Sequence, residues 1–447
     1  MKKTLITSMF LLTLISCKKF LDEKPDKKLV VPSTLADLQD LLDNTNNMVN
    51  ADPYVAELST DDIYVTTATW NTLADYDRNV YLWQKDNLYE PTFNDWLTLY
   101  RKIYTANTVL EALEKIEQVP SNAVEWNNIK GQALMHRGRA LLLGVLIWSK
   151  AFDETTADTD MGIPIRLNTD MGEPAIRPSV RQTYARVIAD LEASIPLLPN
   201  KGMHPIRASK VAAWGFLARA YTAMRNYPKA GLYSDSSLQV NNSLLNYNTL
   251  TTTPTYTIPP VNTEINFLNS FTVMSINPTY GRVDSLLYAT YAANDCRKTV
   301  FFMVNADGSI SFRGSYMNNA AAFSGTSTDE MFLTRAESFA RAGNTIAAMS
   351  DLNKLLQARI KTGTFIPLTA TDPTDALNKI LVERRKQLLV RGIRWMDIKR
   401  LNKEGAAISL TRKISNIIYT LVPNANGFAL PIPEFVINLS GMPQNPR

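Results

Sequence analysis

Long segments whose apolar residues recur every three or four positions constrain the fold of this chain most strongly. The first begins after Asn94, a residue type that often caps a helix, and ends near residue 116. Its apolar stripe consists of Trp96, Leu99, Tyr100, Ile103, Leu110, Leu113 and Ile116. A second segment covers residues 124–152, and Pro120 separates the two. Because a helix with one apolar face must bury it, we expect an antiparallel helical hairpin here.

Helical segments recur along the rest of the chain. The further predicted helices cover residues 34–43, 180–198, 210–225, 229–240, 328–342, 345–360 and 375–400. Trp214 is followed by Leu217 and Tyr221, and Ala218 and Ala230 stand where two helices would cross. This pattern resembles a tetratricopeptide unit, although its period of about 34 residues is interrupted. The sequence therefore predicts a mostly α protein with scattered tetratricopeptide-like helical pairs rather than a regular solenoid.

Two regions lack the helical period. Residues 51–90 are rich in Asp, Thr, Tyr and Trp and predict a long structured connection, in which Trp83 alternates like a residue of a buried strand. Residues 250–327 are rich in Thr, Asn, Pro, Gly and Tyr and predict a loop-rich insertion, which is usually functional at this size. We expect one helical domain over residues 34–447, with a tetratricopeptide-like part at about 34–245 and a loop-rich and helical part at about 246–447.

The N-terminus has the order of a bacterial lipoprotein signal. Lys2 and Lys3 precede an apolar stretch at residues 5–15 that is too short to span a membrane, and Ser16 precedes Cys17. We expect residues 1–16 to be a signal peptide and Cys17 to carry a diacylglyceryl group and a further acyl chain such as palmitate, which together anchor the protein stably. Residues 17–33 would then form the lipidated N-terminus and tether. The alternative is an ordinary cleaved signal with an accidental cysteine.

Composition limits the available classes of function. The net charge of +5 and the pI near 8.9 are mild, so nucleic acid is not an expected partner. Basic residues concentrate in residues 384–400, which we interpret as a half-buried helix with a solvated basic face. Cys17 and Cys296 are the only cysteines, so acylation of Cys17 leaves no disulfide, and Cys296 is predicted to be a buried small residue.

No catalytic or metal-binding motif stands out. His136 and His204 do not have the spacing of metal ligands, so neither a metal nor another cofactor is predicted. The sequence also contains no nucleophile elbow and no phosphate-binding glycine loop. Asp61 and Asp62 are interpreted as turn or capping residues. A glycosidase needs only two carboxylates, so the sequence leaves that enzyme class open.

Several motifs occur in a characteristic order. They include Cys17-Lys18-Lys19-Phe20-Leu21-Asp22, Asn94-Asp95-Trp96, Lys130-Gly131-Gln132-Ala133-Leu134, Leu217-Ala218-Arg219-Ala220-Tyr221, Gly392-Ile393-Arg394-Trp395-Met396-Asp397, Leu430-Pro431-Ile432-Pro433-Glu434 and Gln444-Asn445-Pro446. In this order they resemble the SusD/RagB family of outer-membrane nutrient-uptake lipoproteins from Bacteroidetes. Arg391 departs from the family pattern, which has an acidic residue before the glycine.

The resemblance implies a function as well as a fold. Such proteins lie on the outer membrane, lipid-anchored and facing outside, as a lid over a TonB-dependent transporter of the SusC type. They bind a glycan or another nutrient for uptake, and they are not enzymes. Two alternatives stay open, namely a lipid-anchored all-α glycosidase and a protein-binding tetratricopeptide scaffold. The ligand itself could be starch, a host glycan, a plant polysaccharide or a peptide.

Aromatic residues outside the predicted helices are the candidate ligand contacts. Sugars present flat C–H faces, and a ring offers packing area with few rotamers to order. The candidates are Trp70 and Tyr76 in the first irregular region and Tyr280 and Tyr316 in the second. The aromatic residues on helical stripes, which are Trp96, Trp148, Trp214 and Trp395, are predicted to belong to the core.

Overall fold

A computed structural model of the chain describes residues 32–272 and 274–447. The predicted signal peptide, Cys17 and almost all of the predicted tether lie outside the described residues. The first described helix, α2 (Leu35–Asp43), confirms the prediction for residues 34–43. Thr34 caps it, because its side chain accepts a hydrogen bond from the backbone of Asp37.

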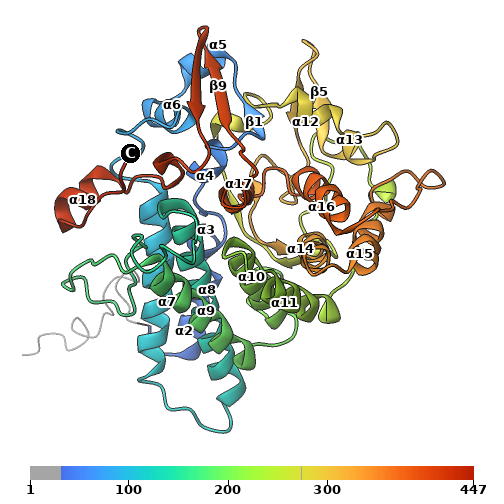
Figure 1. Cartoon of the computed structure of the whole chain (residues 1–447). Coiled ribbons are helices and arrows are strands. Elements are labelled where there is room, and N and C mark those ends of the chain that lie inside the picture. The colour runs from blue at the N-terminus through green and yellow to red at the C-terminus, as the bar shows by residue number, and fades with distance from the viewer. Residues whose placement is uncertain (1–31, 273) are drawn as a thin grey trace, which may run out of the picture.

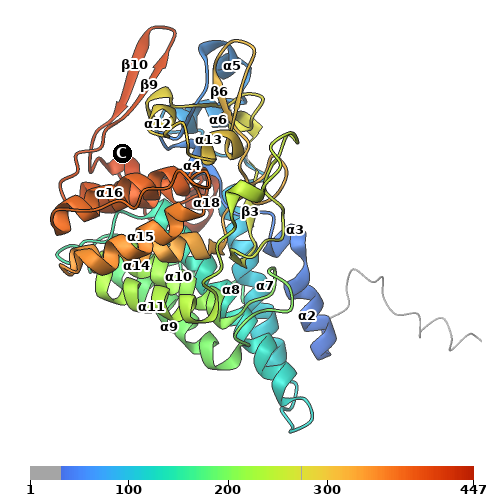
Figure 2. The same cartoon turned by 90° about the vertical axis from the view of Figure 1, so that its right-hand side faces the viewer.

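A row of helices forms the body of the protein (Figure 1). Its members are α7 (Asp95–Leu113), α8 (Ala123–Trp148), α9 (Val180–Ser194), α10 (Lys210–Ala223), α11 (Tyr227–Val240), α14 (Thr328–Arg341), α15 (Thr345–Gln357) and α16 (Pro373–Gln387). From α7 to α15 each member packs against the next, and α16 packs against α14 and α15 (Figure 2). The helical pairs predicted from the sequence are thereby confirmed.

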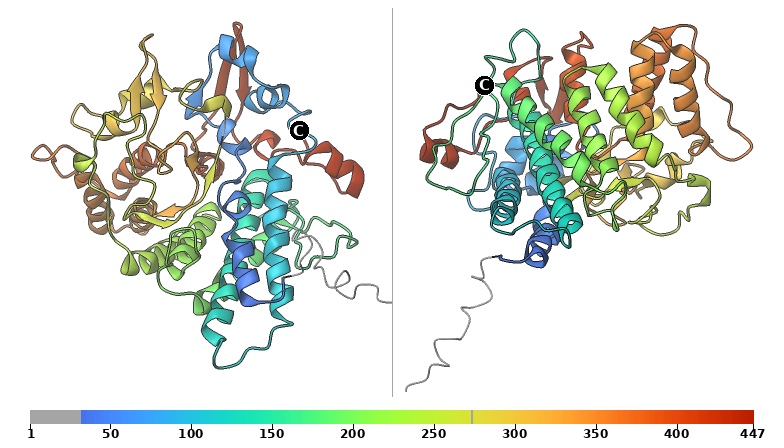
Figure 3. Two further views of the ribbon diagram at one scale, coloured as in Figure 1. Left: turned by 180° about the vertical axis from the view of Figure 1, so that it is seen from behind. Right: turned by 90° about the horizontal axis from the view of Figure 1, so that it is seen from below.

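The row is more continuous than the sequence indicates. Helices α11 and α14 are far apart in the sequence but pack directly against each other. The view from below shows the row passing from the teal helices through green to orange without a gap (Figure 3). The pairs are therefore scattered in the sequence only, and the intervening insertion lies outside the row.

Capping residues explain where the helices begin. Asn94 accepts a hydrogen bond from Leu97 N at 3.0 Å, as its position before α7 predicts. Asn226 and Asn344 cap α11 and α15 in the same way, just after the first helices of their pairs. Gly343, with φ of +82°, turns the chain between α14 and α15.

The two irregular regions contain short elements. The first holds α3 (Thr45–Met48), α4 (Val55–Leu58), β1 (Ile63–Tyr64), α5 (Thr67–Thr72) and α6 (Asp75–Tyr81). The second holds β2 (Ile265–Phe267), β3 (Ser270–Phe271), β4 (Arg282–Val283), α12 (Ser285–Ala289), α13 (Arg297–Val300), β5 (Phe302–Val304), β6 (Ile310–Phe312), β7 (Ala322–Phe323) and β8 (Thr326–Ser327). The strands form antiparallel pairs, β1 with β4, β2 with β8, β3 with β7 and β5 with β6.

The C-terminal part continues with α17 (Arg394–Asn402), the hairpin of β9 (Leu410–Ile414) and β10 (Ile417–Leu421), and α18 (Glu434–Ser440). Single-turn 3₁₀ helices occur at Ile195–Leu197, Tyr247–Thr249, Met274–Ile276 and Asn426–Phe428. Trp83 is buried as expected, but the strand predicted around it is wrong. It follows α6 with a φ of +55°, and its indole N–H donates to Ser59 O at 3.0 Å.

The single helix predicted over residues 375–400 is also wrong. The chain leaves α16 at Gln387 and begins α17 at Arg394, and Val390 and Gly392 between them have positive φ angles of 55° and 68°. A left-handed backbone conformation ends a helix, and Gly392 adopts it without a steric penalty.

Most of the basic residues of this segment are buried rather than solvated. The Arg391 guanidinium lies 3.0 Å from Asp329, and Arg400 lies 2.6 Å from Glu337. Arg384 and Lys386 are buried as well, the first paired with Asp397 and the second with Glu383. The predicted solvated face is therefore wrong, because the acidic partners come from elements that the local sequence does not show.

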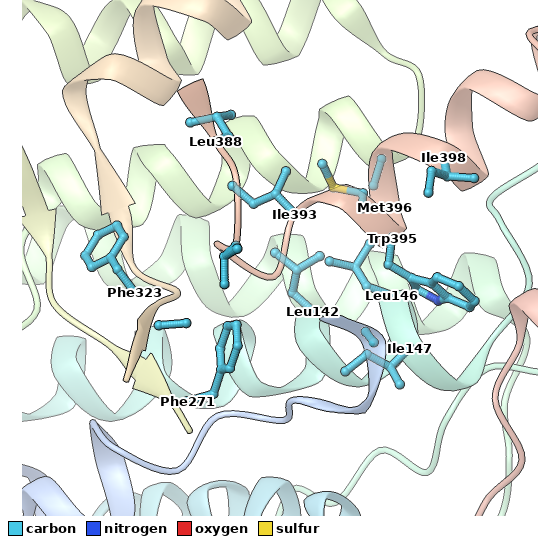
Figure 4. Packing of buried hydrophobic residues seen from close by; sticks show 14 of the residues in the cluster. Leu142, Leu146, Ile147, Phe271, Phe323, Leu388, Ile393, Trp395, Met396 and Ile398 are labelled. Carbon is cyan, nitrogen blue, oxygen red and sulfur yellow. The ribbon is translucent and has the colours of Figure 1, made fainter. Parts of the chain in front are cut away.

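Part of the apolar core lies between α8 and the bend that connects α16 with α17 (Figure 4). Leu142, Leu146 and Ile147 project from α8 toward Trp395 and Met396 of α17. Cys296 is buried with its thiol free, in agreement with the prediction. Within residues 32–272 and 274–447, no helix is long and apolar enough to cross a membrane.

Candidate functional site

The two irregular regions meet at the strand pair β1–β4. Ile63 lies opposite Val283, and Tyr64 lies opposite Arg282. Gly281 allows both the turn before β4 and this approach, because a Cβ built on it would clash with the backbone oxygen of Ile276 and lie 2.7 Å from Ile63 Cγ2. The fold thus brings residues 51–90 and 250–327 together, with α5 and α6 beside the strands at the end of the molecule opposite α9 (Figure 1).

Aromatic rings are exposed around this junction, and we call Tyr64, Trp70, Tyr76 and Tyr280 the aromatic surface. Tyr64 and Tyr280 are 39% and 41% exposed, and Trp70 and Tyr76 are half-buried. Of the four predicted contacts, Trp70, Tyr76 and Tyr280 lie here, although Trp70 and Tyr76 belong to α5 and α6 rather than to loops. Their contact with a ligand stays a prediction.

The sequence analysis missed Tyr64. Its neighbours Ile63 and Val65 are buried, so the ring stands on the exposed side of a short strand. The alternation of two β-branched residues around one aromatic residue was the available signal. It was too short to distinguish from irregular chain.

The prediction that Tyr316 contacts a ligand is wrong for this structure. Tyr316 is 0% exposed, and the Arg391 guanidinium lies 4.1 Å from its ring centroid. Its hydroxyl is 3.1 Å from Tyr247 Oη and donates to Asp329 Oδ2 at 3.1 Å. Tyr316 is thus part of the buried polar core.

Polar contacts fix the elements that carry these rings. The turn before β4, which carries Tyr280, is fixed by Arg282, whose Nη1 donates to Thr279 O at 3.1 Å and Gly281 O at 3.0 Å. Next to Tyr76, Asp77 accepts a hydrogen bond from Tyr54 Oη at 3.0 Å, and burial raises the pKa of Asp77. The Arg78 guanidinium lies 5.3 Å from the Trp70 ring centroid. A preorganised surface loses little entropy on binding.

A groove of about 710 Å³ is the second distinctive surface. It lies between α7, the segment at residues 164–175 and α18, and Tyr100 and Tyr104 of α7 line it. Met171 and Leu439, on opposite walls, are 82% and 88% exposed. Exposed apolar side chains around a concave surface are typical of a protein-binding site.

Asp61 and Asp62 lie in the bend between α4 and β1, as the sequence indicated, but their side chains form ion pairs and cap no helix. Arg394 Nε lies 2.7 Å from Asp61 Oδ1, and Arg385 Nη2 lies 3.0 Å from Asp61 Oδ2. Although burial opposes its ionisation, these arginines hold the pKa of Asp61 at about 2. Burial, together with the charge of Asp61, raises the pKa of Asp62 to about 6.

No group of three or more His, Cys, Asp and Glu side chains in the described ranges has an arrangement that could hold a metal ion. Of the two histidines, His136 is buried, where burial and the nearby Arg139 lower its pKa to about 3, and His204 is exposed.

Comparison with known proteins identifies the fold. Residues 19–222 match the SusD-like family model described as "Starch-binding associating with outer membrane". A SusD superfamily protein from Bacteroides vulgatus superposes with a TM-score of 0.74 at 18% identity, over 92% of this chain and 99% of that one. The fold is SusD-like. The resemblance stated from the sequence is therefore confirmed.

Further SusD-like neighbours carry descriptions of sugar binding. A sugar-binding protein from Bacteroides vulgatus gives a TM-score of 0.72 at 20% identity, over 93% of this chain and 99% of that one. Surface glycan-binding protein A from Bacteroides uniformis gives a TM-score of 0.65 at 17% identity, over 92% of this chain and 99% of that one. None of the curated proteins searched matches the sequence of this chain.

Proposed function

We propose that this SusD-like protein captures an oligosaccharide at the cell surface and passes it to a TonB-dependent transporter of the SusC type. The observation that carries the proposal is that the β1–β4 pair brings together the two irregular regions in which Tyr64, Trp70, Tyr76 and Tyr280 lie at least partly exposed. Relatives with this fold are described as sugar-binding or glycan-binding proteins, which supports a glycan as the ligand.

Binding without catalysis is the function that this surface supports. Its rings can pack on the C–H faces of sugars. Of the two carboxylates just before β1, Asp61 is held ionised by two arginines, so it is a poor general acid, and Asp62 is buried. A lipid-anchored glycosidase would release sugar products from a polysaccharide that the protein binds, whereas a binding protein would return it unchanged.

The groove between α7 and α18 is our proposed contact surface for the transporter. The family is described as associating with the outer membrane, and Met171 and Leu439 expose apolar side chains along a concave surface. Arg101 and Tyr104 on the rim are of types enriched in protein interfaces. Acyl chains on Cys17 would hold the protein at the membrane beside its partner.

Calorimetry with a panel of starch, plant and host oligosaccharides tests the ligand. We expect Tyr280→Ala to weaken binding of the recognised glycan by ~1 kcal/mol or more without changing the melting temperature. Tyr104→Ala is the matched control, because Tyr104 is 46% exposed but lies in the groove. Equal binding by the parent and by variants at all four rings would place the site elsewhere.

Gentle detergent extraction tests the partner. The tagged parent should copurify with a TonB-dependent barrel, and a Met171→Asp, Leu439→Asp variant should not, while its glycan affinity stays unchanged. Intact mass should show acyl chains on Cys17, and Cys17→Ala should release the protein from the membrane. A protein that binds the transporter but no glycan or peptide would instead support the scaffold alternative.

A further inference from the structure

Arg385 of α16 contacts carboxylates on both sides of the β1–β4 pair. Its Nη2 lies 3.0 Å from Asp61 Oδ2 and 3.8 Å from Asp284 Oδ2, and its Nε lies 3.5 Å from Asp62 Oδ1. Asp61 and Asp62 immediately precede β1, and Asp284 immediately follows β4. One guanidinium therefore connects the start of one strand with the end of the other.

The strand pair needs such a connection. Strands β1 and β4 are only two residues long each, and a short two-stranded pair is at best marginally stable by itself. A further link between their flanks is a long hydrogen bond from Asp284 N to Asp62 O at 3.4 Å. Helix α16 belongs to the rigid row, so Arg385 ties the strands to the scaffold.

Arg394, the second arginine at this site, contacts the carboxylates on one side of the strand pair only. Arg394 of α17 lies 2.7 Å from Asp61 and 3.9 Å from Asp62, both on the β1 side. The Asp62 side chain is buried, and those of Asp61, Asp284 and Arg385 are partly exposed. These ion pairs are therefore less screened by solvent than pairs on an open surface.

We propose that Arg385 is a positioning residue for the aromatic surface, which rests on the proposed function. By bridging Asp61 and Asp62 to Asp284, it fixes β1 relative to β4 and thus the ring of Tyr64 relative to that of Tyr280. A ligand that spans both rings then meets a surface that is already ordered. Without the bridge, the ligand must order the two segments itself, and the affinity falls.

Hydrogen exchange and calorimetry on full-length Arg385→Gln test the proposal together. We expect faster amide exchange in residues 63–72 and 277–284, unchanged exchange in α7, α8 and α14, and about tenfold weaker glycan binding. Arg385→Lys should restore the slow exchange and the glycan affinity only in part. An ammonium is a point charge that cannot reach three carboxylates in the manner of a planar guanidinium.

Two further variants keep the test decisive. Arg181→Gln is the matched control, because Arg181 pairs with Glu154 and Asp158 at 3.0 and 2.9 Å on a distant exposed surface. If Arg385→Gln does not fold, Asp284→Asn serves, since it removes the charge while an amide oxygen still caps α12. Asp284→Asn should speed amide exchange in residues 277–284 only.

The outcomes separate this proposal from the proposed function. A parent protein that binds no glycan overturns the function, while the exchange data still decide whether Arg385 holds the strands. A parent that binds glycan, loses it in Tyr280→Ala and keeps it in Arg385→Gln and Asp284→Asn, with unchanged exchange, overturns the role of Arg385 alone.

Discussion

The helical row and the aromatic surface are held together by different means. The helices of the row are 13–26 residues long and bury continuous apolar stripes against one another. The elements of the aromatic surface are two to seven residues long, and neither α5 nor β4 has an apolar stripe of its own. The row therefore folds by packing, whereas the aromatic surface depends on ion pairs and close approaches to its neighbours. A change in one should leave the other largely intact.

Breaking the buried ion pair that joins the row to α17 should have the largest effect. Arg400 Nη1 and Nη2 donate hydrogen bonds to Glu337 Oε1 and Oε2 of α14 at 2.6 and 2.9 Å, and both side chains are buried. Glu337→Gln leaves a buried guanidinium with one carboxylate fewer, which should cost ~3–5 kcal/mol of the free energy of unfolding. Chemical denaturation measures this loss. Glycan affinity of the molecules that remain folded should not change.

Exposed Glu154 provides the control for that prediction, because its pair with Arg181 is open to solvent. Glu154→Gln should leave the denaturation midpoint where it was. Equal losses in both variants would contradict the view that burial sets the strength of these pairs.

Separating β4 from β1 should have a smaller effect on stability and a larger one on binding. In Gly281→Ala, the new methyl group meets the backbone oxygen of Ile276 and the side chain of Ile63, so both the turn before β4 and its contact with β1 must shift, and overpacking of this kind costs ~1–3 kcal/mol. We expect weaker glycan binding and faster amide exchange near Tyr64 and Tyr280. Gly172→Ala is the control, since its Cβ would meet only the Asp170 side chain at 3.2 Å.

Unchanged glycan binding in Gly281→Ala, with the strand pair shown to be displaced, would mean that the relative position of these two rings does not matter.

The smallest expected effect is a pH dependence at the contact between α4 and the α16–α17 bend. Glu57 is buried, and its Oε2 accepts a hydrogen bond from Gly392 N at 2.9 Å. Burial, together with the charge of Asp62, raises the pKa of Glu57 from 4.5 to about 8. The folded state therefore binds more protons than the unfolded state between these values, so the contribution of Glu57 to stability falls as the pH rises through this range.

Glu57→Gln removes that titration. The parent should lose stability relative to this variant on going from pH 5 to pH 8. Thermal unfolding of both proteins at each pH measures the difference, and the other titrating groups are common to the two. A constant difference across the range would show that Glu57 is ionised in the folded protein.

Local sequence signals were sufficient for the row. Asn94, Asn226 and Asn344 mark helix starts because a side-chain cap acts within three residues. The bend after Gln387 was missed because the apolar period continues through residues 388–398, and Gly392 was the only local sign that the helix ends.

The aromatic surface was less predictable because long-range contacts determine it. Arg385 and Asp61 are 324 residues apart, and nothing in either neighbourhood indicates the other. Tyr280 and Tyr316 lie in the same loop-rich insertion and look alike in sequence, yet one is exposed and the other is buried against Arg391. Without a regular period, the sequence does not show which way such a ring points.

The direct packing of α11 on α14 has a consequence for how this architecture can diversify. The ends of the insertion, at Val240 and Thr328, are held by neighbouring helices whatever lies between them. The entropic cost of closing a longer loop between fixed ends grows only slowly with its length. Evolution or engineering can therefore replace this segment and give the same scaffold a different specificity. The replacement must keep an acidic partner for Arg385.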